Sequence, residues 1–539
     1  MNIENKSESR PFIIVGAGAA GTAAAKCFAA AGLAGRAILL EQHSEPGGSA
    51  GYFSRGMPKR TFDAGATQLI ECESGQIQNI IYTLAASDNQ ASPEDLFERI
   101  PTITQHWEDG GIKITLHADG RVSWNGPRQP DEHETAEMER LEKFIAACHS
   151  EAGWMWSLLR QIPRFPLQGV MDVVRALAVF LKVPFLKKCT FPVLWLLSCR
   201  QMMTFYGIKK GSLADDVLSG LLVDTTQNSP EKSPWLASAM GISILRRGIF
   251  RCRKGMRSYF RPMLNSFIER GGTYKPHQAV RRIETVAAGF RVTFEDTKNH
   301  TTTAVETDQS VLLNLTLADI TGGLVPENDP LRKTKVFRRW TRIAAREKCW
   351  GAFALYALVE DKPEWPDAPH YHQMFARRSD PYELQSSLYV SIPARNDPAQ
   401  PVGFRILTAT IHLNETNVSP QQRLQWQEIL SSRIETNLAV RLSHTESAVP
   451  ETFARYTGRR SGLVGGFPLR FGNFLFFANP STLSHPQIPD CKLILMGDNV
   501  FPGQGVVACC VSGIIAFERA TKLTFRKILA RVLPAVYGR

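Results

Sequence analysis

Pro11-Phe-Ile-Ile-Val-Gly-Ala-Gly-Ala-Ala-Gly21 joins a short apolar run to the glycine pattern G-x-G-x-x-G. The apolar run predicts a buried parallel strand, and the alanine-rich residues 22–31 that follow predict a helix. A second apolar run, Ala37-Ile-Leu-Leu40, ends on the acidic residue Glu41. This order of strand, glycine turn, helix, strand and acid is the fingerprint of a dinucleotide-binding βαβ unit.

Each fingerprint residue has a physical reason for its type. Gly16 allows the tight turn after the strand, and Gly18 lets the backbone approach a pyrophosphate. Gly21 lets the helix pack close to the strand, and the helix N-terminus faces the phosphates. Glu41 can accept hydrogen bonds from the hydroxyl groups of a ribose. We therefore expect a Rossmann-like α/β fold around this unit.

Further glycine-rich motifs lie on both sides of a long intervening segment. Glu45-Pro-Gly-Gly-Ser49 and Thr61-Phe-Asp-Ala-Gly-Ala-Thr67 follow the fingerprint closely. Near the other end, Leu493-Ile-Leu-Met496 predicts a strand that leads into Gly497-Asp498. Phe501-Pro-Gly-Gln-Gly-Val506 then opens a helix of small residues. If both ends meet one cofactor, the nucleotide-binding domain is assembled from discontinuous segments.

In this order, the motifs resemble those of carotenoid desaturases and carotenoid isomerases, a group of FAD-dependent oxidoreductases within the flavin amine oxidase superfamily. Residues 62–68, 387–391 and 456–466 carry the same resemblance. Ser49, after the double glycine, is more similar to isomerases and late desaturases than to phytoene desaturases. The arginine-rich residues 246–261 depart from the family pattern, which leaves the identity of the substrate open.

The resemblance implies that the cofactor is FAD. It also implies that Val280 packs beside the adenine and that Asp498 contacts the ribityl chain or pyrophosphate. The glycine turn before the last helix would present N–H groups near the flavin, where a helix N-terminus stabilises negative charge. No metal-binding residue is predicted. The predicted cofactor-binding residues are Gly16, Gly18, Ala19, Ala20, Gly21, Glu41, Gln42, Gly47, Gly48, Ser49, Gly65, Ala66, Thr67, Val280, Gly497, Asp498, Gly505 and Val506.

The fold class expected from these observations is α/β, with a discontinuous Rossmann-like FAD-binding domain, an α+β substrate domain and a helical membrane-contacting cap. Alternating apolar residues between Gly351 and His412 predict an antiparallel sheet. A β-meander without ligand contact is the alternative for the residues around Val280. The expected divisions are 1–86, the first FAD-binding segment; 87–243, a mostly helical cap; 244–320, the second FAD-binding segment; 321–455, the substrate domain; and 456–539, the third FAD-binding segment with a C-terminal basic helix.

The composition of the 539-residue chain favours a globular protein, with 43% hydrophobic and 21% charged residues. Its net charge of +12 suits an anionic partner, but no nucleic-acid-binding motif accompanies the charge. The ten cysteines are scattered without metal-site spacing, which favours a reducing, cytoplasmic setting. His370 and His372 are expected on one strand face, without a third ligand nearby and with a structural role.

A membrane surface is the expected partner besides the substrate. No run reaches the roughly 18 to 20 apolar residues that span a bilayer. Residues 170–206 combine apolar and basic side chains, as helices do that dip into an anionic leaflet; a buried cap with snorkelling lysines is the alternative. Basic residues 246–261, 332–348 and 520–536 favour the lipid surface. We therefore expect a cytoplasmic, peripherally membrane-associated protein and leave its oligomeric state open.

The resemblance implies that the substrate is a long apolar polyene or isoprenoid. Desaturation would transfer a hydride to flavin N5, and the polyene itself activates the neighbouring C–H bonds, so no strong base is required. Accordingly, the sequence indicates no catalytic side chain. The alternatives are redox-neutral cis–trans isomerisation with reduced FAD, a flavin oxidase or monooxygenase reaction on an amine or soluble metabolite, and lipid carriage without chemistry, as in prenyl-binding escort proteins of this fold.

Overall fold

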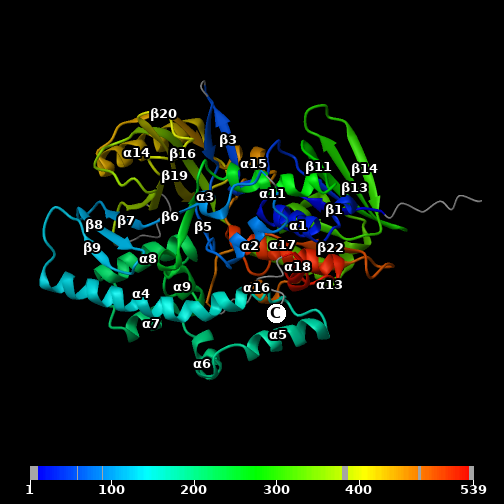
Figure 1. The fold of residues 1–539 in the computed structure, drawn as a ribbon, viewed down its shortest axis with the longest axis horizontal. Coiled ribbons are helices and arrows are strands. Elements are labelled where there is room, and N and C mark those ends of the chain that lie inside the picture. The colour runs from blue at the N-terminus through cyan, green and yellow to red at the C-terminus, as the bar shows by residue number, and fades with distance from the viewer. Residues whose placement is uncertain (1–9, 57–58, 88, 379–386, 472–474, 533–539) are drawn as a thin grey trace, which may run out of the picture.

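The structure is a computed structural model that describes residues 10–56, 59–87, 89–378, 387–471 and 475–532. Two large sheets dominate these residues, and long helices lie beneath them in the view of Figure 1. Segments from both ends of the chain lie side by side in the half that holds the first strand (Figure 1).

The first sheet is six-stranded, in the order β11-β2-β1-β15-β22-β21, and its strands pair in parallel except for β21 with β22. Its strands come from three widely separated regions of the sequence, as a discontinuous Rossmann-like domain requires. The predicted α/β fold class is confirmed. The strands are β1 (Phe12–Val15), β2 (Ala37–Leu40), β11 (Thr273–Lys275), β15 (Val311–Leu313), β21 (Thr482–Ser484) and β22 (Lys492–Leu495).

Side-chain alternation along β1 divides the core around this sheet into two. Ile14 points into the cluster beneath the helices α1, α17 and α11, whereas Ile13 points into the cluster beneath a three-stranded sheet and α13. Helix α17 packs on α1 so closely that a Cβ at Gly513 would lie 2.2 Å from the Ala20 carbonyl oxygen. These elements are α1 (Ala19–Ala30), α11 (Arg257–Glu269), α17 (Val506–Thr521), β12 (Gln278–Val286), β13 (Gly289–Asp296), β14 (Thr302–Thr307) and α13 (Lys335–Arg346).

The second sheet is eight-stranded, in the order β20-β16-β19-β18-β17-β7-β8-β9, and contains the strands predicted between Gly351 and His412. Its pairs are antiparallel except for β17 with β7. The capping box at Ser419 opens α14, as expected. The elements are β7 (Thr102–Trp107), β8 (Ile112–His117), β9 (Val122–Trp124), β16 (Gly351–Glu360), β17 (His370–Phe375), β18 (Ser387–Ile392), β19 (Phe404–Leu413), β20 (Leu442–Ala448) and α14 (Pro420–Leu438).

The prediction that residues 87–243 are mostly helical is wrong for the beginning of that segment. Residues 97–124 form β6 (Phe97–Ile100) and the strands β7 to β9. The reason is that Thr102-Ile-Thr-Gln-His-Trp107 has only two apolar residues, and its polar residues Gln105 and His106 are buried on opposite faces of the strand, so no apolar alternation marks it. The remaining helices are α4 (Glu132–Leu159), α5 (Val170–Leu181), α6 (Phe185–Trp195), α7 (Cys199–Phe205), α8 (Leu213–Thr225), α9 (Trp235–Ile242) and α10 (Ile244–Arg247).

Two arginines of the basic stretch 246–261 pair with carboxylates in the interior. Arg247 contacts the buried Glu71, and Arg251 donates to Asp63 over 2.9 Å with both side chains buried. Helix α18 (Phe525–Val532) turns its apolar side chains into the core against α1. Basic side chains on α13, by contrast, are exposed. The lipid-facing interpretation is therefore wrong for Arg247 and Arg251, because each neutralises a buried carboxylate.

No described helix has both the length and the apolar character needed to cross a bilayer. Shorter elements connect the layers. They are η1 (Ala34–Arg36), η2 (Gly48–Ala50), β3 (Tyr52–Arg55), β4 (Arg60–Asp63), β5 (Leu69–Ile70), α2 (Ile77–Thr83), α3 (Pro93–Leu96), β10 (Ile249–Cys252), α12 (Leu317–Asp319), η3 (Ile320–Leu324), η4 (Pro330–Lys333), α15 (Pro450–Thr457) and α16 (Leu475–Ala478).

Candidate functional site: a cavity between the glycine loops and the large sheet

A cavity of about 1370 Å³ lies at the carboxyl ends of the parallel strands and extends to β17, β18 and β19 of the second sheet. Ligands of open α/β sheets bind at this edge. The fold brings nearly all the predicted cofactor-binding residues to the wall of this one cavity. The exceptions are Ala20, Gly21 and Gly497, which do not belong to the lining.

The fingerprint glycines leave room that a side chain would fill. Gly16 has a φ of +88°, and a Cβ there would lie 2.9 Å from the carbonyl oxygen of Asn314. A Cβ at Gly21 would lie 1.9 Å from the Gly16 carbonyl oxygen, so Gly21 serves close packing rather than ligand contact. At Gly18 a Cβ would meet Asn314 Nδ2 at 2.6 Å. The backbone turn is thus open to a phosphate only because these positions are glycines.

Glu41 directly follows β2, and two backbone N–H groups hold its carboxylate in place. Its Oε2 accepts a hydrogen bond from the Ala17 backbone N–H over 2.6 Å, and its Oε1 accepts one from His43 N–H over 2.9 Å. Burial raises the pKa of Glu41, although these N–H groups act in the opposite direction. The carboxylate lines the cavity and retains lone pairs for a pair of ribose hydroxyls.

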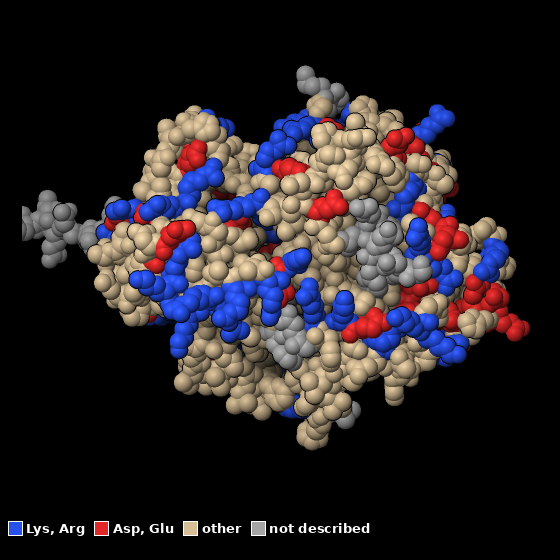
Figure 2. Space-filling model, turned by 180° about the vertical axis from the view of Figure 1, so that it is seen from behind, with Lys and Arg blue, Asp and Glu red and all other residues tan. Residues whose placement is uncertain are grey.

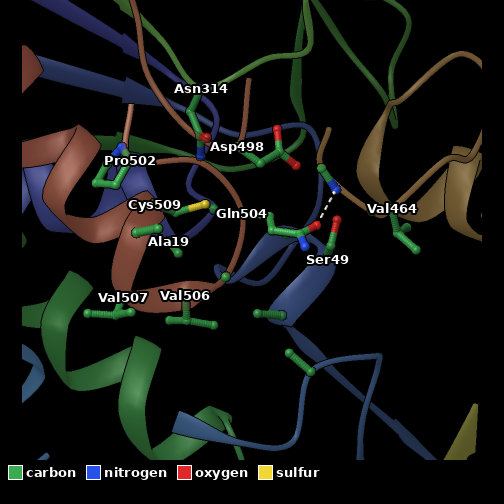
Figure 3. A pocket seen from close by; sticks show the side chains of 18 of the residues that line it. Ala19, Ser49, Asn314, Val464, Asp498, Pro502, Gln504, Val506, Val507 and Cys509 are labelled. Carbon is green, nitrogen blue, oxygen red and sulfur yellow. Dashed lines mark hydrogen bonds between the residues drawn. The ribbon is translucent and has the colours of Figure 1, made fainter. Parts of the chain in front are cut away.

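The C-terminal motif closes the opposite wall. Figure 3 shows Asn314, Asp498 and Gln504 directed toward one space, above the start of α17. Gly505, with a φ of +94°, precedes α17, and a Cβ there would meet no atom within 4 Å. The first N–H groups of α17 are therefore accessible for an anionic group. Arg459 donates to Asp498 over 2.7 Å, which orients this carboxylate.

Asn314, Arg459 and Gln504 were not predicted as site residues. Arg459 lies in residues 456–466, for which the sequence indicated a family resemblance but no role. Asn314 follows β15, and the rule that ligands bind at the carboxyl ends of parallel strands could have identified it. The glycine cradle, the fixed acid and the helix N-terminus together fit a dinucleotide cofactor.

Away from the glycine loops, the cavity forms a mostly apolar chamber lined by helices α4, α5, α6, α8 and α9 and by strands of the second sheet. Asp224 and His412 are its ionisable members on α8 and β19, and the sequence indicated neither. Burial lowers the pKa of His412 to about 4, so this imidazole is neutral at pH 7. Apolar members of the chamber wall include Trp154, Met155, Phe180, Phe191, Trp195 and Leu236.

His370 and His372 do have a third histidine nearby, contrary to expectation. His370 Nδ1 lies 2.9 Å from His372 Nε2, and His372 Nδ1 lies 3.1 Å from His106 Nε2. The contact arises because β17 pairs with β7, which the sequence did not predict. Burial lowers the pKa of all three, to about 2 for His370 and His106 and about 4 for His372. No cluster suited to a metal occurs among the described residues.

Comparison with known families supports the assignment of the fold. The model of the family described as an NAD(P)-binding Rossmann-like domain matches residues 14–83. Curated relatives over nearly the full length are prolycopene isomerases. The chain is 23% identical to prolycopene isomerase 2 of an Oncidium hybrid cultivar, covering 97% of this chain and 86% of the relative. It is 23% identical to the enzyme of Daucus carota, covering 95% and 80%.

Solved structures show the same fold at lower identity. An oxidoreductase from Methanosarcina mazei is 12% identical with a TM-score of 0.59, and the match covers 94% of this chain and all of that one. A fatty acid isomerase from P. acnes is 13% identical with a TM-score of 0.53, covering 96% and 99%. The resemblance to the carotenoid isomerase and desaturase group is confirmed, as is the prediction of an enzyme.

Proposed function

We propose that this chain, as a flavoenzyme similar to the carotenoid isomerases and desaturases, binds FAD and oxidises a long apolar polyene by desaturation. One observation carries the proposal. A single cavity joins the glycine cradle, where a dinucleotide fits, to an apolar chamber. A soluble amine or other polar metabolite would gain little from a chamber whose wall is mainly aromatic and aliphatic.

The residues have separate tasks in this proposal. The glycine cradle and Glu41 bind the adenosine and pyrophosphate groups, while Asp498 and the start of α17 face the flavin end. FAD supplies a two-electron hydride acceptor when it is bound. The aromatic chamber positions the polyene and excludes water from the reacting carbons. The intact cradle also argues against a lipid carrier without redox chemistry.

Redox-neutral cis–trans isomerisation is the second candidate, and a specific observation favours it. The curated relatives that align with 95–97% of this chain are named prolycopene isomerases. Ser49 after the double glycine is a further similarity to the isomerase branch. The same cofactor site and apolar chamber would serve this reaction, because both reactions place an extended polyene beside the flavin.

An anaerobic assay separates the two candidates. FAD-loaded protein in liposomes should react with at least one member of a panel of linear carotenoids. Bleaching of the visible band of oxidised flavin, matched by a product with one more double bond, is the result expected for desaturation. A changed geometric isomer without net flavin reduction would identify an isomerase. Liposomes without carotenoid provide the control, and a flavin-containing protein that transforms no polyene would contradict the proposal.

We also propose that the substrate enters from an anionic membrane at the cytoplasmic face. Helix α5 borders the chamber with residues such as Ala176 and Phe180, while its other side is exposed. Val170, Met171 and Phe185 are 79%, 73% and 81% exposed, which is unusual for large apolar side chains. A contiguous apolar surface at a cavity mouth is typical of lipid or partner contact.

Charge around this surface supports the membrane proposal. Figure 2 shows a band of Lys and Arg side chains across the lower half of the rear face, above a lobe with few charges. Figure 1 places α13 at the height of this band and α5 and α6 in the lobe. A basic band above an apolar lobe matches the headgroup and acyl layers of an anionic leaflet. Exposed basic residues of α13 and its flanks are Lys333, Lys335, Arg338, Arg339, Arg342, Arg346 and Lys348.

The double substitution Leu181→Glu and Phe185→Glu should weaken binding to anionic vesicles by at least about tenfold. Each apolar side chain that enters a leaflet contributes roughly 1.5–3 kcal/mol, and a carboxylate also repels anionic lipid. Vesicle cosedimentation measures the partition. Val402→Glu is the control, since Val402 is 99% exposed and lies in the loop before β19. Equal loss of binding in both variants would contradict the assignment of this surface.

A further inference from the structure

We propose that the carboxylate of Asp224 is the proton acceptor of the reaction, an inference that rests on the proposed function. Asp224 is in the last turn of α8, and its side chain lines the cavity. Among the residues that the structure describes, none donates a hydrogen bond to this carboxylate or forms an ion pair with it. A carboxylate without a partner in an apolar chamber is costly, and such groups are typical of reactive sites.

The end of α8 is tied to the loop that opens α17. The carbonyl oxygen of Thr225, next to Asp224, accepts a hydrogen bond from Gln504 Nε2 over 3.3 Å. Gln504 is followed directly by Gly505 and Val506, which the sequence assigns to the flavin end of the cofactor. The Gln504 side chain also accepts from the Gly466 N–H over 3.3 Å (Figure 3). Asp224 is therefore held beside one wall of the cofactor site.

Asp224 is also connected, through Tyr371, to Gln68 in the loop that contains Thr67. Burial raises the pKa of the Tyr371 phenol, and the negative charge of Asp224 adds to this effect. The side chain of Gln68, the residue after Thr67 of the predicted cofactor set, acts on the pKa of the same phenol in the opposite direction. Asp224, Tyr371 and Gln68 thus line the same cavity as Thr67.

The surroundings give this carboxylate the properties of a base near neutral pH. Burial raises the pKa of Asp224 to about 6. It is then mostly ionised at pH 7, yet binds a proton more tightly than an ordinary aspartate. The other titratable groups on the same side are Tyr371 and Tyr389, with ring centroids 6.4 Å apart, and His412, 5.3 Å from Tyr389. Tyr371 and His412 are uncharged at pH 7, because burial raises the pKa of Tyr371 and lowers that of His412.

The step balances as a two-electron oxidation. A proton leaves one allylic carbon of the polyene and binds to Asp224. A hydride leaves the neighbouring carbon and goes to oxidised FAD, the oxidant of the proposed function. The two C–H bonds break and a C=C bond forms. Asp224 then returns its proton to water before the next turnover. A carboxylate in the wall of the chamber provides an acceptor for this proton.

The test is the variant Asp224→Asn, assayed as FAD-loaded protein. The rate constant of flavin reduction by the polyene should fall at least about a hundredfold, while the FAD content stays at the wild-type level. In the wild type the rate should rise with pH through about 6 and then level, because only the ionised carboxylate accepts a proton. The variant should lose this dependence.

Infrared titration without substrate provides a readout independent of turnover. The wild-type spectrum minus that of Asp224→Asn should show a protonated carboxyl band that disappears as the pH rises through about 6. Asp216→Asn is the matched control, because Asp216 is on the same helix and burial raises its pKa to about 6 as well. Asp216 does not line the cavity and instead binds Arg378 over 2.7 Å. This control should keep the wild-type rate and its pH dependence.

Each outcome decides the inference. An Asp224→Asn protein that reduces its flavin, or isomerises the polyene, within about threefold of the wild type overturns the role of Asp224 alone. The absence of the titrating carboxyl band overturns it too. A wild-type protein that transforms no polyene overturns the proposed function, and the role of Asp224 with it. A partial recovery of the flavin-reduction rate in Asp224→Glu would support a proton acceptor, because the glutamate carboxylate can accept a proton and the asparagine amide cannot.

Discussion

Replacing Gly16 with valine should give a folded protein that retains less than about a tenth of the wild-type FAD. The left-handed backbone at Gly16 costs an L-residue about 1–2 kcal/mol, and more for a β-branched one. In addition, the new Cβ would lie 2.9 Å from a backbone oxygen of Asn314. The turn must shift, and with it the N–H groups that face the pyrophosphate. Flavin content per protein, measured after denaturation, tests this expectation.

Gly32→Val separates backbone strain from the contact at the cradle. Gly32 also has a positive φ, +72°, but a Cβ there would meet no atom within 4 Å. It follows α1 and does not line the cavity. Both variants therefore share the strain, and only one disturbs the cradle. Wild-type FAD content in Gly16→Val, or equal loss in Gly32→Val, would contradict the cofactor-site assignment.

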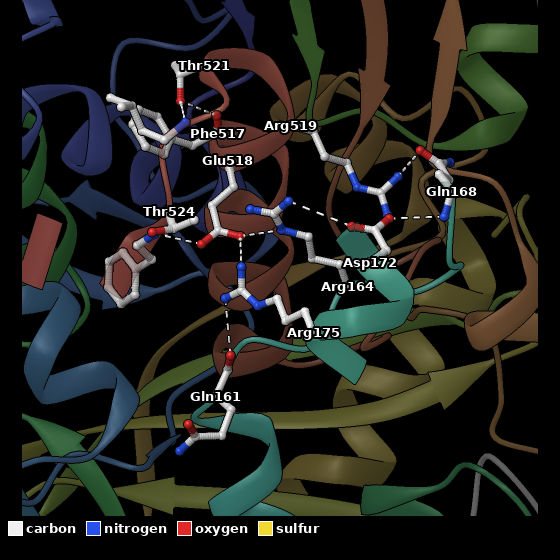
Figure 4. A network of polar contacts seen from close by, with 12 residues as sticks. Gln161, Arg164, Gln168, Asp172, Arg175, Phe517, Glu518, Arg519, Thr521 and Thr524 are labelled. Carbon is white, nitrogen blue, oxygen red and sulfur yellow. Dashed lines mark hydrogen bonds and ion pairs between the residues drawn. The ribbon is translucent and has the colours of Figure 1, made fainter. Parts of the chain in front are cut away.

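Glu518→Gln should lower the free energy of unfolding by about 3–5 kcal/mol, the usual cost of removing one charge from a buried ion pair. Glu518 of α17 is 1% exposed and accepts from Arg164 over 2.6 Å and from Arg175 of α5 over 2.8 Å. Figure 4 shows both guanidinium groups directed at this one carboxylate. The amide would leave two arginines without this counter-charge at the junction between α17 and the cap. Chemical denaturation measures the change.

An exposed ion pair provides the control for this prediction. Glu306 accepts from Arg291 over 2.6 Å, but both side chains remain partly in water. Glu306→Gln should therefore change the free energy of unfolding by no more than about 1 kcal/mol. Limited proteolysis should in addition cut residues 160–170 of the Glu518→Gln protein faster. Similar stability of the two variants would show that the cap does not depend on Glu518.

Some of the cofactor site could be predicted from the sequence because its signals are local. The strand, the glycine turn, α1 and Glu41 fall within 31 residues, Pro11 to Glu41, and each has a residue type that the backbone or the ligand requires. The start of α14 at Ser419 was predictable for the same reason, since a capping box is complete within four residues. The inference that the cofactor is FAD depended on the order of motifs that are far apart in the sequence, and it remains a prediction.

The predictions that were wrong or missing concern residues whose role depends on contacts with distant parts of the sequence. Strand β7 was not predicted because both faces of its residues meet protein, so no simple alternation marks it. Residues 246–261 have the composition of a surface, yet Arg251 is buried because Asp63 lies beside it. Asp224 could not be distinguished from any acid near the end of a helix.

Local sequence was thus sufficient for the βαβ unit and its ligand-facing glycines, because short-range backbone geometry restricts those residue types. Only the tertiary structure brings Asp224, Gln504 and Tyr371 to the wall of one cavity. It also places the carboxylate of Glu518, on α17, between Arg164 and Arg175. Burial and charge pairing depend on which residues exclude water around a group. Those residues are supplied by segments hundreds of positions apart, and no local pattern specifies them.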